Sequence, residues 1–186
     1  MPIRVVVADA CSALNLLATD RASDFLHALD WTLILHPEVK QEAQYLRGPP
    51  DEEGQPTRLV CDWSALEQAG RVLPPEPADL GASFEDAFVG AAVWLTDVDA
   101  KAVALAGALA LPLLSDDGKV REVFQRLYPA LELQATLELI RRASERLGLS
   151  PDRVREVLRT LRSKARFAPP RNDPSRDWYE EHLSND

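Results

Sequence analysis

The chain has 186 residues, of which 46% are hydrophobic and 27% are charged, and its formal net charge is −9. This composition excludes disorder over the whole length, and two cysteines are too few for a disulfide scaffold. The longest uncharged apolar run, residues 102–114, is too short to cross a bilayer, and the first residues lack the layout of a signal peptide, so we expect a cytoplasmic protein without a membrane contact.

Short apolar runs that alternate with helical patterns indicate an α/β fold. The runs predict strands at residues 5–8, 31–35, 71–73, 111–115 and 130–134, with a strand or hairpin at 59–63. Apolar positions at helical spacing predict helices between residues 13 and 29, from 37 to about 47, and at 79–95, 98–110, 118–127, 135–147 and 151–164. Residues 48–56 are expected to form a loop because they are rich in proline, glycine and acids. This alternation predicts a parallel sheet covered by helices on both faces.

Acidic residues occur where such a sheet places its chemistry, at the carboxyl ends of its strands. No histidine pair with metal-ligand spacing and no glycine-rich phosphate loop accompanies them. Clustered carboxylates need a positive partner, and all-oxygen sites suit Mg²⁺ or Mn²⁺, which can assist the hydrolysis of a phosphodiester. Four segments supply the acids: Asp9 after the first strand, Glu38 and Glu42 after the second, Asp97 and Asp99 on the helix before the strand at 111–115, and Asp116 and Asp117 at its end.

Each of these acids also has a purely structural interpretation. Asp9 stands at a strand-to-helix turn, where an aspartate is a good N-cap. Glu42 can be an exposed helix former, and Asp116-Asp117-Gly118 can be turn chemistry. Asp97 has the position of an N-cap, so Asp99 is the stronger metal candidate of that pair.

Four stretches that contain these acids resemble the motifs of PIN-domain proteins. In that family the opening strand ends in an acid, and the second motif reads Pro-x-x-Val-x-x-Glu. The third motif is an Asp followed by an Ala-rich helix, and the fourth is a strand that ends in Thr/Ser-x-Asp. The matching stretches are residues 7–17, 36–42, 99–106 and 113–117. The resemblance spans roughly residues 3–135 and is closest to the toxin-like branch of toxin–antitoxin systems.

The resemblance implies a PIN-like three-layer α/β/α sandwich over residues 1–135, with C-terminal helices at 136–166 packed on it and a tail at 167–186. It also implies a metal-dependent endoribonuclease that acts on RNA, the toxin of a toxin–antitoxin pair, with a cognate antitoxin and a homodimer as further partners. The implied site residues are Asp9, Glu42, Asp99 and Asp117 around one or two Mg²⁺ or Mn²⁺ ions, Asp116 as the alternative to Asp117, Ser115 as a hydrogen-bonding support, and Asn15 orienting Asp9 or the substrate.

The charge distribution favours a second hypothesis, a PIN-like binding or scaffold module without significant nuclease activity. Residues 1–140 carry a net charge of −12, against which RNA must approach, whereas residues 141–176 carry +7. A basic strip near the C-terminus predicts a contact with RNA or with an acidic partner, or else a solvated helix face. The strip consists of Arg155, Arg159, Arg162 and Arg166.

Overall fold

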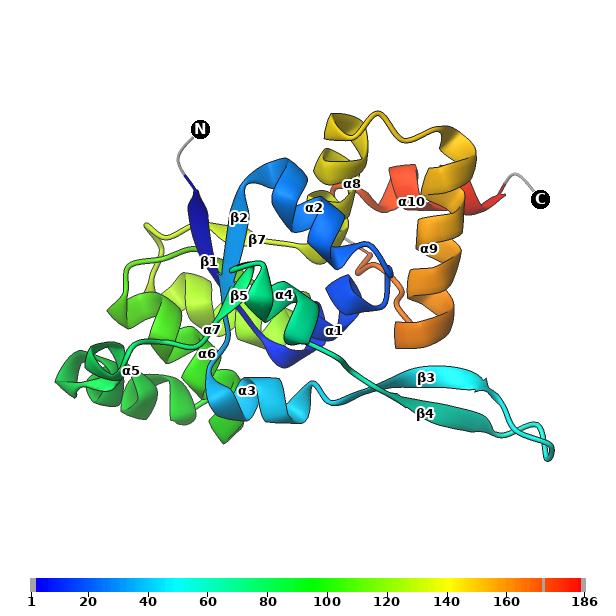
Figure 1. Cartoon of the computed structure of the whole chain (residues 1–186). Coiled ribbons are helices and arrows are strands. Elements are labelled where there is room, and N and C mark those ends of the chain that lie inside the picture. Colours follow the sequence, from blue (N-terminus) through cyan, green and yellow to red (C-terminus); the bar gives the residue numbers. More distant parts are fainter. Residues whose placement is uncertain (1–2, 172, 185–186) are drawn as a thin grey trace.

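The computed structural model describes residues 3–171 and 173–184, and within these ranges the central sheet has five parallel strands. Their order is β5–β2–β1–β6–β7, with β1 in the middle (Figure 1). Val7 of β1 pairs with Ile34 of β2 on one side and with Leu113 of β6 on the other. The sequence-based α/β class is therefore confirmed. The strands are β1 (Arg4–Ala8), β2 (Trp31–Ile34), β5 (Val72–Leu73), β6 (Leu113–Leu114) and β7 (Leu133–Gln134).

Helices cover both faces of the sheet, as expected for a three-layer sandwich (Figure 1). One layer consists of α5 (Ala82–Ala92), α6 (Asp97–Ala108) and α7 (Gly118–Leu127). The opposite layer consists of α1 (Ala10–Leu17), α2 (Ala22–Leu29) and α8 (Thr136–Arg146). Right-handed crossovers produce this division, because the chain leaves β1 toward β2 first and later returns to build β6 on the other side.

Two further helices extend the layer that contains α1. Helix α9 (Pro151–Ala165) packs against α1, and α10 (Arg176–Ser184) packs against α9. The segment 167–186, expected as a tail, thus contains a helix, which is anchored by Tyr179, whose hydroxyl donates to the Phe167 carbonyl over 3.2 Å. Among the described residues, no helix combines the length and the apolar character that a membrane span requires.

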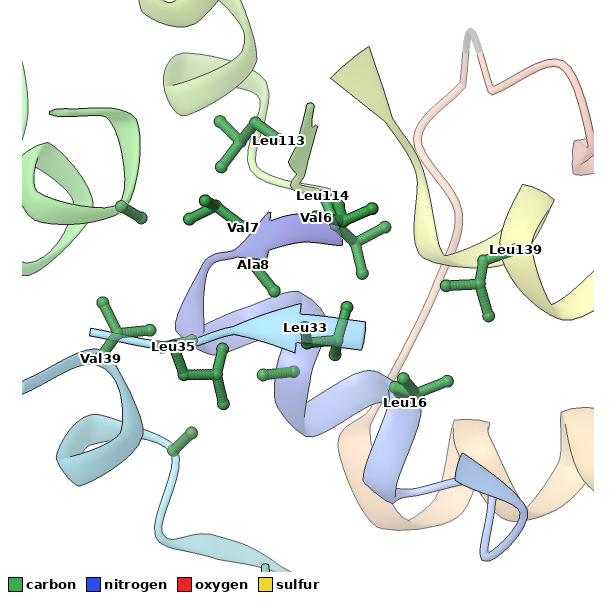
Figure 2. Close-up of a cluster of buried hydrophobic side chains, with 14 of the residues drawn as sticks. Val6, Val7, Ala8, Leu16, Leu33, Leu35, Val39, Leu113, Leu114 and Leu139 are labelled. Carbon is green, nitrogen blue, oxygen red and sulfur yellow. The ribbon is translucent and has the colours of Figure 1, made fainter. Parts of the chain in front are cut away.

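The hydrophobic core is centred on β1. Val6, Val7 and Ala8 are fully buried, because neighbouring strands flank them and helices cover both faces. Figure 2 shows these side chains beside Leu33 of β2 and Leu114 of β6. A continuous apolar run in the sequence is therefore what the centre of a doubly covered parallel sheet requires.

The segment after β2 differs from the sequence-based expectation. The helix predicted from residue 37 to about 47 ends early, as α3 (Pro37–Glu42). The expected loop at 48–56 is instead part of an antiparallel hairpin, in which β3 (Tyr45–Pro50) pairs with β4 (Pro56–Val60). The hairpin tolerates its prolines because they lie at its far end, next to a register irregularity where ladder donors are not needed.

The tip of this hairpin is a tight acidic turn. Asp51 Oδ1 accepts hydrogen bonds from the backbone N–H groups of Glu53 (3.1 Å) and Gln55 (2.7 Å), and Gly54 has a φ of +78°. The hairpin projects from the body of the molecule, and its base lies beside α9 (Figure 1).

The expected strand or hairpin at 59–63 corresponds to the end of β4, after which the short helix α4 (Ser64–Gln68) leads to β5. A 3-10 turn, Pro77–Leu80, precedes α5.

Two helical glycines provide a test of the packing between α6 and α7. A Cβ added at Gly107 would lie 2.1 Å from Cζ of Tyr128, whereas one added at Gly90 would meet no described atom within 4 Å. We expect Gly107→Ala to lower the free energy of unfolding by about 1–3 kcal/mol through overpacking. Gly90→Ala should raise it by about 0.5–1 kcal/mol through helix propensity. Urea denaturation measures both, and equal stability of the two variants would contradict this packing.

Candidate functional site

The order of the strands changes direction between β1 and β6, and this switch point forms the base of the candidate site. In open parallel sheets, the crevice at such a point receives ligands at the carboxyl ends of the strands. Asp9 directly follows β1, and Ser115 directly follows β6. The Asp9 N–H donates to the Leu114 carbonyl over 3.1 Å, which fixes the two strand ends side by side. The structure therefore brings together the two strand-end segments that the sequence singled out.

Asp9 is a buried carboxylate with an incomplete set of partners. It is the N-cap of α1, and its Oδ1 accepts the Ser12 N–H over 2.7 Å. Its side chain is only 2% exposed, and its Oδ2 forms no hydrogen bond with any described residue. Burial, and to a smaller extent the negative charge of Asp116, raise the pKa of Asp9 to about 7, against the lowering effects of hydrogen bonding by Ser115 and Ser12. Such a group is stabilised by any cation that reaches it.

Ser115 lies near Asp9 and lowers the pKa of that carboxyl group. Its hydroxyl is fully buried and makes no hydrogen bond of acceptable geometry within residues 3–171 and 173–184. Two buried oxygens, Asp9 Oδ2 and Ser115 Oγ, thus lie at the same place in the fold, and apart from one another neither has a hydrogen-bond partner among the described residues. Unsatisfied buried polar groups are costly, and their retention points to a function rather than to stability.

Asp116 connects the end of β6 to the helices beside it. Its Oδ2 accepts hydrogen bonds from Asn15 Nδ2 (2.9 Å) and Ser12 Oγ (3.4 Å), and its Oδ1 accepts the Thr136 N–H (2.9 Å). Asn15 was expected to orient Asp9 or the substrate, and within the described chain it orients Asp116 instead. Asp116 therefore lies beside Asp9 in a fixed position, held by α1 and by the first turn of α8.

Asp117 and Asp99 both have structural partners at the starts of helices. Asp117 is the N-cap of α7, where its Oδ1 accepts the N–H groups of Lys119 (2.8 Å) and Val120 (3.0 Å). Asp99 Oδ2 accepts a hydrogen bond from Thr96 Oγ1 over 2.7 Å in the first turn of α6. Thr96 is the N-cap of that helix, so the assignment of this role to Asp97 was wrong. Thr96 serves as the N-cap because its hydroxyl accepts a hydrogen bond from the Asp99 N–H.

The Cys11 thiol shows that the expected acids converge on one region. Partial desolvation and the negative charges of four side chains together raise the pKa of this thiol to about 11. They come from four parts of the fold: the end of β1, the last residue of α3, the first turn of α6 and the start of α7. In order of effect these residues are Asp9, Asp117, Asp99 and Glu42.

The acids offer the oxygen ligands that a divalent cation prefers, but they do not enclose a cation on all sides. Within residues 3–171 and 173–184, no three His, Cys, Asp or Glu side chains are grouped closely enough to hold a metal ion. Mg²⁺ commonly binds through one or two carboxylates and keeps several waters, so it does not need such a group. The free Oδ2 of Asp9, next to the fixed Asp116, meets this smaller requirement.

The four arginines of the basic strip have different neighbours. Arg155 donates to Asp152 (2.7 Å) and to the His182 carbonyl (3.1 Å), which ties α9 to α10. Arg162 lines a pocket between α9 and α10, and Arg159 is exposed. Arg166 alone among these four arginines lines the pocket beside the acids, a cavity of about 420 Å³ that includes Asp116 and Asp117.

Sequence reasoning missed several residues that line this pocket. They come from the hairpin, which was expected to be a helix end and a loop, and from the segment just after α9. The alternation of exposed Tyr45, half-buried Leu46 and exposed Arg47 is a strand pattern that could have revealed the hairpin. The missed lining residues are Tyr45, Arg47, Lys164 and Phe167.

No family model, curated protein sequence or solved structure matches this chain. The resemblance to PIN-domain proteins therefore depends on four short motifs.

The buried carboxyl of Asp9 predicts a pH-dependent stability. It holds its proton up to about pH 7 in the folded protein but only to about pH 3.8, the ordinary pKa of an aspartate, when unfolded. The folded state thus binds more protons between these values, and its stability falls as the pH rises through this window. Relative to the wild type in EDTA, we expect Asp9→Asn to be more stable at pH 8 by on the order of a few kcal/mol, and the difference to shrink toward pH 4.

Urea denaturation of both proteins between pH 4 and pH 8 measures this difference. The asparagine can keep the bond from the Ser12 N–H, so the substitution removes the charge and preserves the cap. A difference in unfolding free energy that does not change with pH would contradict the raised pKa of Asp9.

Proposed function

We propose that this chain is a Mg²⁺- or Mn²⁺-dependent endoribonuclease of the PIN type. The observation that carries the proposal is the buried carboxylate of Asp9, whose Oδ2 lacks a partner within the described residues, with Asp116 beside it and further acids from three other elements acting on the nearby Cys11 thiol. A fold does not retain such an arrangement for stability, because like charges repel and burial disfavours ionisation. A divalent cation would relieve both costs.

The residues of the chain would share the work of binding and orientation. Asp9 would offer Oδ2, and Asp116 would stand beside it at an angle fixed by Asn15 and Thr136. Asp117 uses Oδ1 for its helix cap, which leaves its second oxygen as a donor. When bound, a cation would supply Lewis-acid stabilisation of the phosphodiester and acidify water at the site.

Two further acids, Glu42 and Asp99, would complete the site around the substrate. Glu42 is exposed at the end of α3, and Asp99 is half-buried at the start of α6. Both act electrostatically on the Cys11 thiol together with Asp9, so they belong to the same field. That field repels a bare phosphodiester, so seating the scissile phosphate directly against the acids would require the cation, whereas RNA contacts farther from the acids would not.

The biological setting of the proposal comes from the motifs. Their likeness to the toxin-like PIN branch supports a toxin that acts on RNA in the cytoplasm and is inhibited by a cognate antitoxin, and it supports a homodimer. These partners are part of the proposal and depend on the motif resemblance.

A binding or scaffold module without significant nuclease activity is the second candidate. The observation that favours it is the absence, within the described residues, of any group of three potential ligands close enough to hold a metal ion. The structural roles of Asp117 as a helix cap and of Asp99 as the acceptor of the Thr96 hydroxyl add to this interpretation. A module of this kind would bind RNA or a protein without depending on a divalent cation.

Cleavage of RNA distinguishes the two candidates. With Mn²⁺ or Mg²⁺, we expect the wild type to cut a mixed single-stranded RNA and Asp9→Asn to be at least about 100-fold slower, because a direct ligand is lost. Asp86→Asn is the matched control, since Asp86 is an exposed residue of α5 and loses the same charge. Its rate should equal that of the wild type, and EDTA should abolish cleavage.

Equal cleavage by the wild type and Asp9→Asn would remove the catalytic assignment. A loss of activity in Asp86→Asn as large as that in Asp9→Asn would attribute the effect to net charge rather than to the site.

A further inference from the structure

The base of the β3–β4 hairpin and the end of α9 form a basic and aromatic wall next to the acids. The wall consists of Tyr45 and Arg47 from β3 and of Arg166 after α9, and it lines the same cavity of about 420 Å³ as Asp116 and Asp117. We propose that this wall binds single-stranded RNA, with a base stacked on Tyr45 and phosphates held by Arg47 and Arg166. The inference deepens the proposed nuclease function and rests on it for the identity of the nucleic acid.

The hairpin carries two arginines that face each other. Arg47 and Arg58 are directly paired across the antiparallel ladder, so their side chains leave from the same face. Like charges in this position destabilise a hairpin. Both residues are exposed, and no ion pair of either is observed within residues 3–171 and 173–184. An anion bound between the two guanidinium groups would attract both and so offset their repulsion.

Tyr45 supplies the aromatic part of the wall. Its side chain is 47% exposed although it is large and mostly apolar. The guanidinium of Arg58 lies over its ring, with its carbon 5.5 Å from the ring centroid. Aromatic rings interleaved with cations are how single-stranded nucleic acids are held without sequence specificity.

Arg166 occupies a backbone conformation that favours glycine. It ends α9 with φ +54°, in the left-handed region, where a side chain costs free energy and glycine does not. The neighbouring Lys164 has a structural partner in Asp20 at 2.6 Å, whereas Arg166 has no ion pair in the described part of the chain. A charged residue in a strained position beside an acidic site is retained for contact with an anion.

The surroundings favour RNA over an acidic peptide. The tip of the hairpin carries Asp51, Glu52 and Glu53, so only its base attracts an anion. The carboxylates of an acidic peptide gain little from the exposed Tyr45 ring, whereas a nucleotide base, which accompanies every phosphate of RNA, stacks on it. The cavity also falls within the roughly 300–1,000 Å³ range of sites that bury small molecules, large enough for one nucleotide unit.

Binding can be measured without cleavage. A fluorescent 12-nucleotide oligouridine is titrated with the protein in EDTA at several salt concentrations, and anisotropy reports affinity. We expect Arg47→Gln and Arg166→Gly each to weaken binding several-fold and to reduce the salt dependence by about one released ion. Tyr45→Ala should weaken binding about tenfold through lost stacking.

Arg153→Gln is the matched control. Arg153 lies at the other end of α9, roughly 20 Å from Arg166 at 1.5 Å per residue. Its substitution by glutamine removes one positive charge from the same helix. Its affinity should equal that of the wild type. Thermal unfolding separates binding from folding, because Arg166→Gly relieves backbone strain and should be at least as stable as the wild type.

The outcomes separate this inference from the proposed function. Wild-type affinity in Arg47→Gln and Arg166→Gly, or an equal loss in Arg153→Gln, would overturn the wall as the binding site. Competition by polyglutamate as strong as that by RNA would overturn it in favour of an acidic partner. RNA binding that depends on the wall residues, by a protein that cleaves nothing with Mn²⁺, would support the wall and reject the nuclease.

Discussion

The burial of one carboxylate, that of Asp9, is the constraint on which the site depends. The carboxylate is held by the Ser12 N–H at the start of α1, and the β1–β6 pairing carries Asp116 to its side. A helix N-terminus offsets part of the charge of an acid, but one N–H bond does not satisfy two oxygens. The second oxygen and the Ser115 hydroxyl stay unsatisfied among the described residues, so the fold maintains a place with unused capacity to bind a cation.

The topology explains why this place exists. The chain builds the sheet outward from β1 in one direction and later in the other, so the ends of β1 and β6 meet where helices diverge to opposite faces. The helices that begin there, α1 and α7, are capped by Asp9 and Asp117. The same acids thus start helices and face the crevice. Helix capping and ligand binding are compatible for a carboxylate, because each role needs one of its two oxygens.

Local signals made parts of this structure predictable from the sequence. The helix at 118–127 was predicted at its observed bounds, since Asp117 provides an N-cap and the apolar spacing that follows is regular. The hairpin was missed because a Pro- and Gly-rich segment is typical of a loop, and only pairing with a distant strand makes it extended.

Side-chain partners across the fold were not predictable in the same way. Periodicity places Arg155 on the helix and Arg166 just beyond its end, but it cannot show that Arg155 donates to the His182 carbonyl while Arg166 lines the pocket. Likewise, Asn15 lies within the first motif stretch, yet its partner is Asp116, which is 101 positions away. Contacts of this kind depend on packing between segments, which local patterns do not encode.

Calorimetric titration of the RNA-free protein with Mn²⁺ tests the central claim most directly, because it measures whether the unsatisfied carboxylate receives a cation. The account predicts a binding isotherm for the wild type and a loss of affinity of at least about tenfold in Asp9→Asn. No detectable binding, or equal binding by both proteins, would show that the Asp9 carboxylate is not a cation ligand and would contradict the account.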